Sequence, residues 1–570
     1  MNRLPSRFTM RGNSAGTALT LLLIFALLGM GAWLMLRDKK APDADSATST
    51  TQTQSPTSDG PAPVVDGEAP TPIEPVDGLP TLDAAAAYQA QNGIVEVDIS
   101  EYAGYAGLVV ANGGLDPNPD SFFAKNYGFQ VRLTLSEEES WSKLNNGKVA
   151  ASVTTADVLA ALGRQFEVTV PAQIGFSRGA DMIVVDTGVS SINQLKGKVL
   201  SASQFNESEF FIRYLASEAN VPVTILRDLD ARPPADQLGL VFYEDNDVAC
   251  DAYEHELASG NGRLNGCIGW SPRTDEVIEA SAGKAKMLVS NRNLLIIADL
   301  LVVNKGFAQA KPEWVQGLVH GLLEGNRRVR DEPEAQIATI AKAFKWSDAD
   351  TRDELSKVHL SNLPENQAFF AGTIDAAGSF NGIFQSSVLA YGKLIKNPAD
   401  PARFLDGKQL DALKGKAEFA KQTIAIAPIK TRDGGSLEGD ALLSKDIRFF
   451  FEPNSSALDR DAEENLKYLD SVKNFLQVSP GSIVVLRGHV DNARVGEFER
   501  EGGQALVRTM AMKAMELSRQ RAQAVRDALL KKHQGLAADR IEVVGRGWEE
   551  PAGPDSDLNR RVEVQWFTLE

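Results

Sequence analysis

Four short runs of consecutive apolar residues in the middle of the chain constrain its fold most strongly. They are MIVV at 182–185, KVLSAS at 198–203, LGLVF at 238–242 and LLIIADLLVV at 294–303. Unbroken apolar runs of this kind are typical of strands that are covered on both faces, as in α/β sheets. Segments with helical periodicity lie between or after them, at Ser208–Glu218, Val248–Ala258 and Pro312–Arg328. The alternation predicts βαβ units and therefore an α/β domain.

The C-terminal region shows a different order of elements. An aromatic and β-branched run at Ile447–Phe451 precedes a helical pattern over Asp461–Gln477. Strands are predicted at Ile483–Leu486, Ile541–Val544 and Val562–Phe567, and a second amphipathic helix at Leu517–Lys531. Two helices interleaved with strands in this way predict an α+β domain in which helices pack on one sheet.

The first 89 residues are expected to lie outside the folded domains. After a short Arg-containing N-terminus, residues 1–14, an apolar stretch at 15–36 is just long enough to cross a ~30 Å hydrocarbon core. We interpret it as an uncleaved signal anchor with a cytoplasmic N-terminus, and a cleaved signal peptide is the alternative. Residues 37–89 are rich in Pro, Thr, Ser and Asp and are expected to form a disordered linker. The absence of Lys and Arg from 41 to 124 favours export of everything downstream.

Composition narrows the classes of partner and of chemistry. The formal net charge is −17, and no basic cluster with interleaved aromatic residues occurs, which argues against nucleic acid. A length of 570 residues predicts more than one domain. The five histidines are scattered, and the chain has no GxSxG elbow, no phosphate-cradling loop and no CxxC pair. We therefore expect neither catalysis nor a metal or cofactor.

The two cysteines leave one question open. Cys250 and Cys267 are 17 residues apart, and in an exported protein such a pair can form a disulfide. Yet one begins a predicted helix and the other begins the next predicted strand, positions that a βα unit normally places at opposite ends. The sequence favours neither outcome.

Several segments of the middle region share a family pattern. They are VDISEYAGYAGLVVANGGL at 97–115, TTADVLAAL at 154–162, GADMIVV with SSINQLKGKVL at 179–200, and CIGWSP at 267–272. On these residues, the region 90–415 resembles the solute-binding proteins of the nitrate, sulfonate, taurine and thiamin-precursor group, which serve ABC importers. The resemblance implies two lobes that close on a ligand like a clamp, the second lobe spanning roughly Ser190–Ser290, with hinge closure as the functional motion.

The ligand is expected where strands end and helices begin, facing the space between the lobes. The candidates are Tyr102, Gly104 and Tyr105 in the first strand-to-helix turn, Thr154 and Thr155, the turn residues Ser203, Asn206 and Ser208, and Trp270 and Ser271. Free N–H groups at a helix start favour an anion. Ser, Thr and Asn before a helix are also ordinary N-caps, and Glu207 and Glu209 would repel an anion.

Three short blocks stand in order near the C-terminus: RGHVDN at 487–492, LSRQRA at 517–522 and NRRVEV at 559–564. They resemble the OmpA-like peptidoglycan-binding domain of bacterial envelope proteins. The resemblance implies that Asp491 and Arg521 hold the ammonium and carboxylate groups of diaminopimelate, with His489, Asn559 and Arg560 in the same site. The chemistry fits, because Arg makes bidentate bonds to a carboxylate while an acid pairs with an ammonium group.

The chain departs from that family pattern in two places. Val490 stands where the family usually has Thr, which removes a hydroxyl group. An insertion at roughly Ala493–Met515, rich in Met and Ala, is expected to lengthen the following helix. Such a helix would either cover the site or leave it unchanged.

The combined prediction is a bitopic protein of the bacterial inner membrane with most of its chain in the periplasm. A two-lobed periplasmic-binding-protein-like α/β domain at 90–415 is followed by a linker at 416–439 and an OmpA-like α+β domain at 440–570. We expect it to bind diaminopimelate-type peptidoglycan and a small solute, for which an anion is one option. It would either deliver the solute to an ABC permease or report its occupancy to an envelope complex. The alternative is a structural tether whose central domain binds a protein partner.

Overall fold

The computed structural model describes residues 69–136, 141–373, 378–426, 441–447, 449–451, 455–459, 462–479, 481–554 and 556–567. All of these residues belong to one compact unit within Ala62–Glu570. The expected membrane segment at 15–36 lies outside the described residues. Among the helices that are described, none combines the length and the apolar character needed to cross a bilayer.

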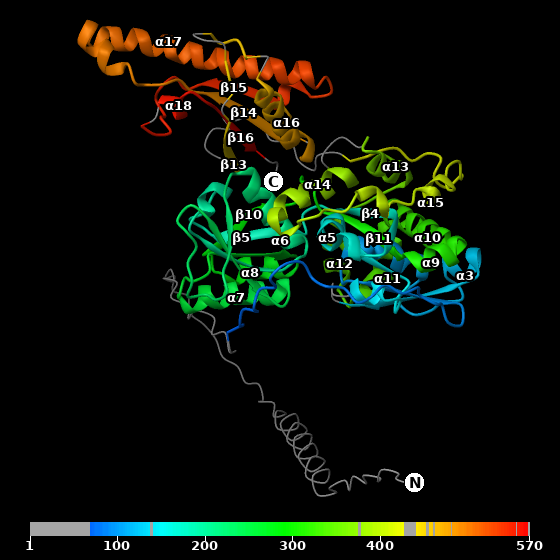
Figure 1. Ribbon diagram of the computed structural model, residues 1–570. Helices are drawn as coiled ribbons and strands as arrows, with labels where there is room; N and C mark the ends of the chain where they lie inside the picture. The colour runs from blue at the N-terminus through cyan, green and yellow to red at the C-terminus, as the bar shows by residue number, and fades with distance from the viewer. Residues whose placement is uncertain are drawn as a thin grey trace, which may run out of the picture. The chain divides into compact units, whose positions relative to one another are not determined.

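The first lobe is built on a six-stranded sheet with the order β12-β4-β11-β3-β1-β2. The strands are β1 (Ile94–Ile99), β2 (Gln130–Leu135), β3 (Ala151–Thr155), β4 (Val168–Ser177), β11 (Ala298–Asn304) and β12 (Val358–Leu360). β1 runs parallel to β2 and β3, whereas β11 is antiparallel to both of its neighbours. Helix α10 (Pro312–Asp331) packs closely on α2 (Ala106–Asn112), because Gly325 and Gly107 let the two backbones touch. Figure 1 shows α10 beside β4 of this sheet.

The second lobe carries another six-stranded sheet, with the order β10-β5-β9-β6-β8-β7. Its strands are β5 (Asp181–Asp186), β6 (Val199–Ser203), β7 (Val223–Ile225), β8 (Leu238–Tyr243), β9 (Gly266–Trp270) and β10 (Ala285–Ser290). Helices α6 (Glu207–Glu218), α7 (Asn246–Ser259) and α8 (Arg273–Ala280) follow β6, β8 and β9. The predicted βαβ units are confirmed. The lobe begins at Asp181 rather than at Ser190, because β5 belongs to this sheet.

Two segments carry the chain between the lobes. Residues 178–180 join β4 to β5, and residues 291–297 join β10 to β11. The predicted strand at 294–303 therefore starts only at Ala298, although Leu294–Ile297 are just as deeply buried. Two sheets joined by two crossing segments form the two-lobed architecture that the sequence predicted.

The remaining helices of this region belong to the loops and to the C-terminal part of the clamp. They are α3 (Phe122–Tyr127), α4 (Trp141–Asn145), α5 (Ala156–Leu162), α9 (Lys305–Ala310), α11 (Pro333–Phe344), α12 (Asp348–Ser356), α13 (Leu363–Ala371), α14 (Phe380–Tyr391) and α15 (Lys408–Asp411). α14 packs against α5, which follows β3, and against α6, which follows β6. It thus contacts one helix from each lobe.

The part of the expected linker that the structure describes is not free chain. Residues 69–89 run as a strap over both lobes and are drawn in blue in Figure 1. The N–H of Ile73 donates to Phe242 O of lobe 2 at 2.9 Å, and that of Leu82 donates to Gln165 Oε1 of lobe 1 at 3.0 Å. Tyr88 is buried, and its N–H donates to Asn304. The structure differs from the expectation here because Leu79, Leu82 and Tyr88 supply apolar anchors within an otherwise polar segment.

The C-terminal domain has a four-stranded sheet with the order β13-β16-β14-β15. The strands are β13 (Leu443–Ile447), β14 (Ile483–Gly488), β15 (Ile541–Gly545) and β16 (Val562–Phe567), and the helices are α16 (Glu463–Val478), α17 (Val495–Lys532) and α18 (Ser556–Asn559). The insertion falls within α17, and the part of it after Gly503 lengthens the helix that contains Leu517. Its helical geometry is interrupted at Gly502 and Gly503, where the φ angle of Gly503 is +58°.

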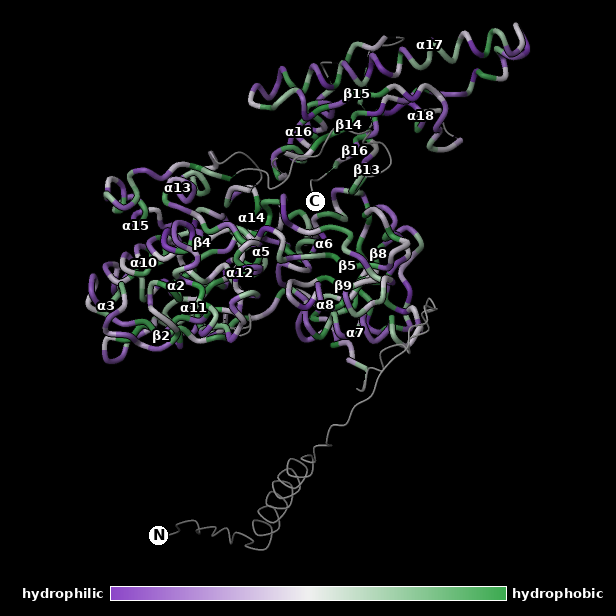
Figure 2. Tube along the Cα trace, turned by 180° about the vertical axis from the view of Figure 1, so that it is seen from behind, coloured by the Kyte–Doolittle hydropathy of each residue, from purple (hydrophilic) through white to green (hydrophobic). Residues whose placement is uncertain are grey.

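In each folded part, the apolar residues are concentrated along the strands. Figure 2 shows the hydrophobic colour along strands such as β5 and β9, while the polar colour dominates the outer turns of the helices. The largest fully buried side chains include Tyr243 and Tyr253 of lobe 2 and Trp566 of the C-terminal domain. The cores are thus centred on the sheets, which leaves the polar strand ends as the candidate sites.

Candidate functional site

The carboxyl ends of β1 and β3 bring the lobe 1 candidates together. Tyr102 follows β1, and its buried hydroxyl group has no partner within hydrogen-bond geometry. The hydroxyl group of Tyr105 donates to Asp299 Oδ1 at 3.2 Å, and the two tyrosine rings meet edge to face at 5.2 Å. Gly104 must be small, because a Cβ there would collide with the ring of Tyr102. This part of the site combines aromatic rings with a carboxylate.

Asp157 is the residue of this region that the sequence did not single out. It lies in the first turn of α5, two residues after Thr155, and it is fully buried. Burial raises its pKa to about 7, and the charges of Asp181 and Glu209 act in the same direction. The hydroxyl of Thr155 and the backbone N–H of Asp157 lower the pKa, but neither reaches the carboxylate with hydrogen-bond geometry.

The hinge is held by a side-chain network around Asp181. Asn291 Nδ2 donates to Asp181 Oδ2 at 2.8 Å, and the Ser177 hydroxyl donates to the same oxygen. Asn291 Oδ1 in turn accepts from the N–H of Gly179 at 2.6 Å. Burial raises the pKa of Asp181 in spite of these donors. The network ties both crossing segments to each other.

The backbone N–H groups at the start of α6 in lobe 2 are bonded to side chains of the same segment. Asn206 caps α6, its Oδ1 accepting from the N–H groups of Ser208 and Glu209. Glu209 Oε2 accepts from the N–H of Phe205 at 2.6 Å, and its Oε1 pairs with Arg213 Nε at 2.7 Å. The N–H groups that were expected to favour an anion are thus already bonded to the protein's own side chains, one of them a carboxylate.

The other lobe 2 candidates take part in contacts within the protein. The N–H of Ser203 donates to Asn246 Oδ1 at 3.2 Å, and Ser208 is fully buried with its hydroxyl unpartnered. Trp270 ends β9 and is half-buried. The Ser271 hydroxyl donates to Glu354 of α12 in lobe 1 at 2.9 Å, so this candidate joins the two lobes.

Tyr391 of α14 completes the site from a third direction. Its hydroxyl donates to Asn206 O at 3.4 Å, and Arg213 lies over its ring with 5.6 Å between the guanidinium carbon and the ring centre. Burial raises the pKa of Tyr391 well above its ordinary value, and Glu209 and Asp157 add to the effect. Tyr391 is therefore close enough to one acid from each lobe for both charges to raise its pKa. The sequence did not indicate it, because α14 is far from both strand ends in the chain.

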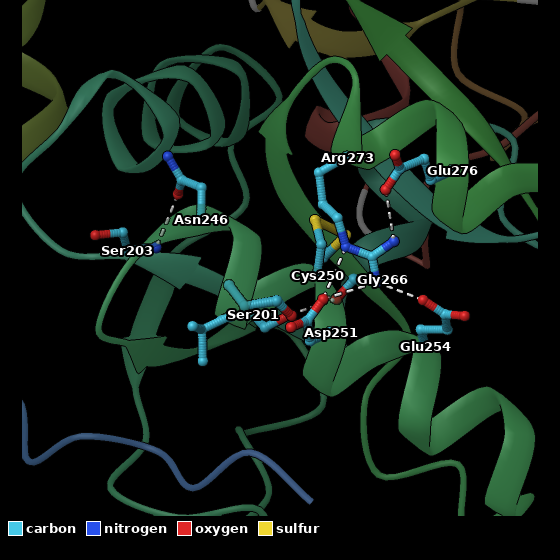
Figure 3. Close-up of a disulfide and its surroundings, with 12 residues drawn as sticks. Ser201, Ser203, Asn246, Cys250, Asp251, Glu254, Gly266, Arg273 and Glu276 are labelled. Atoms are coloured by element: carbon cyan, nitrogen blue, oxygen red, sulfur yellow. Dashed lines mark hydrogen bonds and ion pairs between the residues drawn. A yellow bond between two sulfur atoms is a disulfide. The ribbon is translucent and has the colours of Figure 1, made fainter. Parts of the chain in front are cut away.

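The two cysteines of lobe 2 form a disulfide. Cys250 of α7 and Cys267 of β9 have Cα atoms 5.2 Å apart, which answers the question that the sequence left open. The helix lies across the strand at this point, so both residues face each other in spite of the βα connection. Figure 3 shows Arg273 nearby, bonded to Asp251 and Glu254. The disulfide links α7 to β9 of the lobe 2 sheet.

A hollow elsewhere in lobe 1 plays no part in this site. It measures about 310 Å³ and is lined by Ala85–Ala87, Glu167 and residues 304–306 and 309. These residues lie where β4 begins and β11 ends, at the opposite end of that strand pair from the hinge.

The three C-terminal sequence blocks converge in the structure. The N–H of His489 donates to Arg561 O at 2.9 Å, which joins the first block to the third. Gly488 packs directly on the backbone of Ser518, which joins the first block to the second, and a side chain at position 488 would not fit. The Ser518 hydroxyl accepts from the N–H of Gly547 at 2.9 Å. The blocks thus form one strand-end region.

Asp491 and Arg521, the residues expected to bind the zwitterion, make the following contacts within that region. Asp491 Oδ1 accepts from the N–H of Ala493 at 3.0 Å. Arg521 is half-buried, donates to Ser455 O at 3.3 Å and lies 5.1 Å from the ring centre of Phe451. Burial and the charge of Arg560 lower the pKa of Arg521, so two guanidinium groups are close to each other. Such a pair is suited to a carboxylate.

Asn559 and His489 have contacts that stabilise the loops. Asn559 is 1% exposed; its Oδ1 accepts from the N–H of Ala552 at 2.7 Å, and its Nδ2 donates to Gly553 O at 3.0 Å. His489 Nε2 lies 3.5 Å from Glu563 Oε2. Burial alone would raise the pKa of Glu563, but His489 and the charge of Arg487 bring it to about 2.

Glu563 also belongs to the one group of side chains with metal-like spacing among the described residues. His489, Glu550 and Glu563 bring one ligating atom each within 4.8 Å of one another. Arg487 lies between the two glutamates, at 3.0 Å from Glu563 and 2.6 Å from Glu550. Arg546 lies 3.6 Å from Glu550 and Arg561 lies 3.7 Å from Glu563, so three guanidinium groups surround the two carboxylates. The arrangement therefore fits an ion-pair cluster better than a cation site.

Comparison with known proteins identifies the C-terminal domain. Residues 450–565 match the model of the OmpA family. No curated protein matches the chain.

The central region is similar to several solved structures, among them two sulfonate-binding proteins and one enzyme. The aliphatic sulphonate binding protein SsuA of Escherichia coli has 14% identity and a TM-score of 0.41, over 60% of this chain and 98% of that one. The alkanesulfonate-binding protein SsuA of Xanthomonas axonopodis pv. citri, bound to MOPS, has 14% identity and a TM-score of 0.41, over 56% and 99%. The desulfurization enzyme DSZB has 13% identity and a TM-score of 0.37, over 56% and 98%.

Proposed function

We propose that the protein is an envelope receptor that is held at the peptidoglycan by its C-terminal domain and that binds a small periplasmic solute between its two central lobes. In this proposal the segment at 15–36 anchors the chain in the inner membrane, and Ala41 onwards lies in the periplasm. The receptor either feeds an ABC permease or reports its occupancy to an envelope complex. No catalytic step is part of the proposal.

The observation that carries the proposal is the clamp geometry itself. Two lobes are joined by two crossing segments, and polar side chains from both lobes meet beside the hinge. Three of the groups there, the hydroxyls of Tyr102, Thr155 and Ser208, are buried and have no partner with good hydrogen-bond geometry, although Ser177 lies near Tyr102 and Asp157 lies near Thr155. Because buried polar groups in native proteins are nearly always bonded, a ligand that bonds them when it binds accounts for their presence.

The peptidoglycan part rests on the OmpA family match and on the meeting of the three sequence blocks at one end of the sheet. Arg521 with Arg560 supplies positive charge for a carboxylate, and Asp491 supplies the acid for an ammonium group. Both groups occur on the free end of diaminopimelate, so the proposed ligand is a diaminopimelate-type cell wall.

Solute binding is tested on the purified full chain in detergent. Thermal unfolding is followed with phosphate, sulfate, nitrate, alkylsulfonates, taurine, aminopyrimidines and alkylamines. A ligand at about 100 times its dissociation constant stabilises the native state by ~2.7 kcal/mol, which is easily seen. A folded sample that responds to no member of the panel would favour the alternative, a structural tether whose central domain binds a protein.

Wall binding is tested on the same preparation by sedimentation with isolated diaminopimelate-type peptidoglycan. The full chain should pellet with the wall material and stay in the supernatant without it. If the chain remains in the supernatant in both cases, the peptidoglycan part of the proposal is wrong, whatever the solute panel shows.

A further inference from the structure

Five carboxylates gather where the two lobes meet. Asp157 and Asp299 come from lobe 1, Glu207 and Glu209 come from lobe 2, and Asp181 starts the first strand of lobe 2. They surround the same tyrosines: Asp299, Asp181 and Glu207 act on the pKa of Tyr102, whereas Glu209, Asp157 and Glu207 act on that of Tyr391. Arg213, a basic residue next to these acids, is already paired with Glu209 at 2.7 Å. The site therefore carries an excess of negative charge.

Asp157 is the member of this group whose charge is least compensated. Its side chain is 0% exposed, and neither carboxylate oxygen has a hydrogen-bond partner. Thr155 beside it is 5% exposed, and its hydroxyl group is unpartnered as well. An ionised carboxylate that is buried without a partner is strongly unfavourable, so such a group is retained where something else neutralises it.

The residues around the interlobe acids indicate whether a metal ion or an organic cation would fit there. Calcium and transition metals need several ligating atoms in one small shell. Among the described residues, the interlobe carboxylates form no such shell, since the single group of three with metal-like spacing is in the C-terminal domain. The interlobe acids are instead spread around Tyr102, Tyr105 and Tyr391. Aromatic rings with carboxylates are a suitable environment for an organic ammonium group, which gains from cation–π contact as well as from charge.

We propose that the interlobe site binds an organic cation, a small solute with a protonated amine or quaternary ammonium group, and that Asp157 is its counter-ion. This rests on the proposed function of the central domain as a solute clamp and names the class of its ligand. It departs from the oxyanion that helix starts would otherwise favour. At α6 that place is already filled by Glu209 and Asn206, so an added anion would meet a carboxylate.

The test uses the full chain in detergent at pH 8, with putrescine and choline as cationic probes and methanesulfonate and sulfate as anionic probes, all as simple salts. Binding is measured by titration calorimetry and by the shift in unfolding temperature. At least one of the two cations is expected to bind, and Asp157→Asn is expected to weaken it by about tenfold or more, because the partner of a buried charge is lost. Asp236→Asn, which changes an exposed aspartate of lobe 2, is the matched control and should bind like the wild type.

Each other outcome has a definite meaning. Binding of an anion without binding of either cation overturns the cation assignment and leaves the solute clamp in place. Binding of none of the four probes by a folded sample counts against the cation assignment, and the wider solute panel then decides the clamp. Cation binding that Asp157→Asn leaves unchanged shows that Asp157 is not the counter-ion. If Asp157→Asn does not fold, Tyr102→Phe tests the same site, with a several-fold loss of cation affinity expected.

Discussion

Ser271 at the end of β9 in lobe 2 donates a hydrogen bond to Glu354 of α12 in lobe 1, 2.9 Å from Oε2 and 3.1 Å from Oε1. Both residues are about 5% exposed. Beside them, Lys357 at the C-terminal cap of α12 lies 2.9 Å from Glu354 and 3.0 Å from Asp275 of lobe 2. These contacts join the lobes directly and must break if the lobes separate.

We therefore predict that Lys357→Met shifts the clamp towards an open form. The substitution keeps the aliphatic stem but removes the charge that pairs with Asp275 across the lobes, and it leaves Glu354 with less compensation. The radius of gyration measured by small-angle X-ray scattering should increase, and affinity for any solute of the clamp should fall. The matched control is Arg352→Met on the same helix, because Arg352 pairs with Glu334 within lobe 1. An equal expansion in both variants would show that the cross-lobe contact is not what holds the clamp closed.

The disulfide between Cys250 and Cys267 is predicted to stabilise lobe 2 by about 3 kcal/mol, because it closes a loop of 17 residues. The double variant Cys250→Ser with Cys267→Ser should unfold at lower temperature than the oxidised protein. Reductant should lower the unfolding temperature of the wild type and have no effect on the double variant. A wild type that is insensitive to reductant, with two titratable thiols after denaturation, would show that the bridge does not form.

Peptidoglycan binding is predicted to depend on Arg521 but not on Arg519. Arg521 lies against Phe451 and near Arg560, within the meeting point of the three blocks. Arg519, two residues away on the same helix, is exposed and pairs with Glu516. In sedimentation with isolated peptidoglycan, Arg521→Ala and Asp491→Ala should lose most of the bound fraction, whereas Arg519→Ala should bind like the wild type. Equal losses in the arginine variants would point to non-specific charge attraction.

The two-lobed architecture could be predicted from local sequence patterns, but the candidate site between the lobes could not. The strands at 182–185, 198–203 and 238–242 were predictable because continuous apolar runs need cover on both faces. The same reasoning wrongly predicted a strand at Leu294–Ile297, because this apolar crossing segment is as deeply buried as a strand. Burial alone does not distinguish the two, and only the pairing of strands does.

The hinge and the counter-ion depend on contacts between distant positions. Asn291 and Asp181, which are bonded at 2.8 Å, are separated by 110 residues in the chain. Asp157 is one of 76 acidic residues, and nothing in its local sequence marks it as buried. Its role emerges only when α5, α6 and α14 are packed together. The family resemblance predicted the turns, one of which contains Glu207 and Glu209, but it did not single out Asp157, Asp181 or Asp299.

The buried charge of Asp157 also predicts how stability changes with pH. Burial raises its pKa to about 7, whereas an unfolded aspartate titrates near 3.9. Between these values the folded state binds more protons than the unfolded state, so this group favours folding at low pH. That contribution, up to about 4 kcal/mol, is lost as pH rises towards 7. The neighbouring charges, Asp181 and Glu209, act in the same direction.

Without ligand, Asp157→Asn should therefore unfold at a higher temperature than the wild type at pH 8, because an amide cannot ionise. The difference should shrink by more than half at pH 5 and approach zero only below about pH 3.9, where the aspartate is protonated in the unfolded chain as well. Thermal unfolding of both proteins at the two pH values measures this, with Asp236→Asn as the control that should follow the wild type throughout. A variant that is less stable than the wild type at pH 8 would mean that the Asp157 carboxylate already has a favourable partner in the unliganded clamp, which would also remove the need for a cationic ligand.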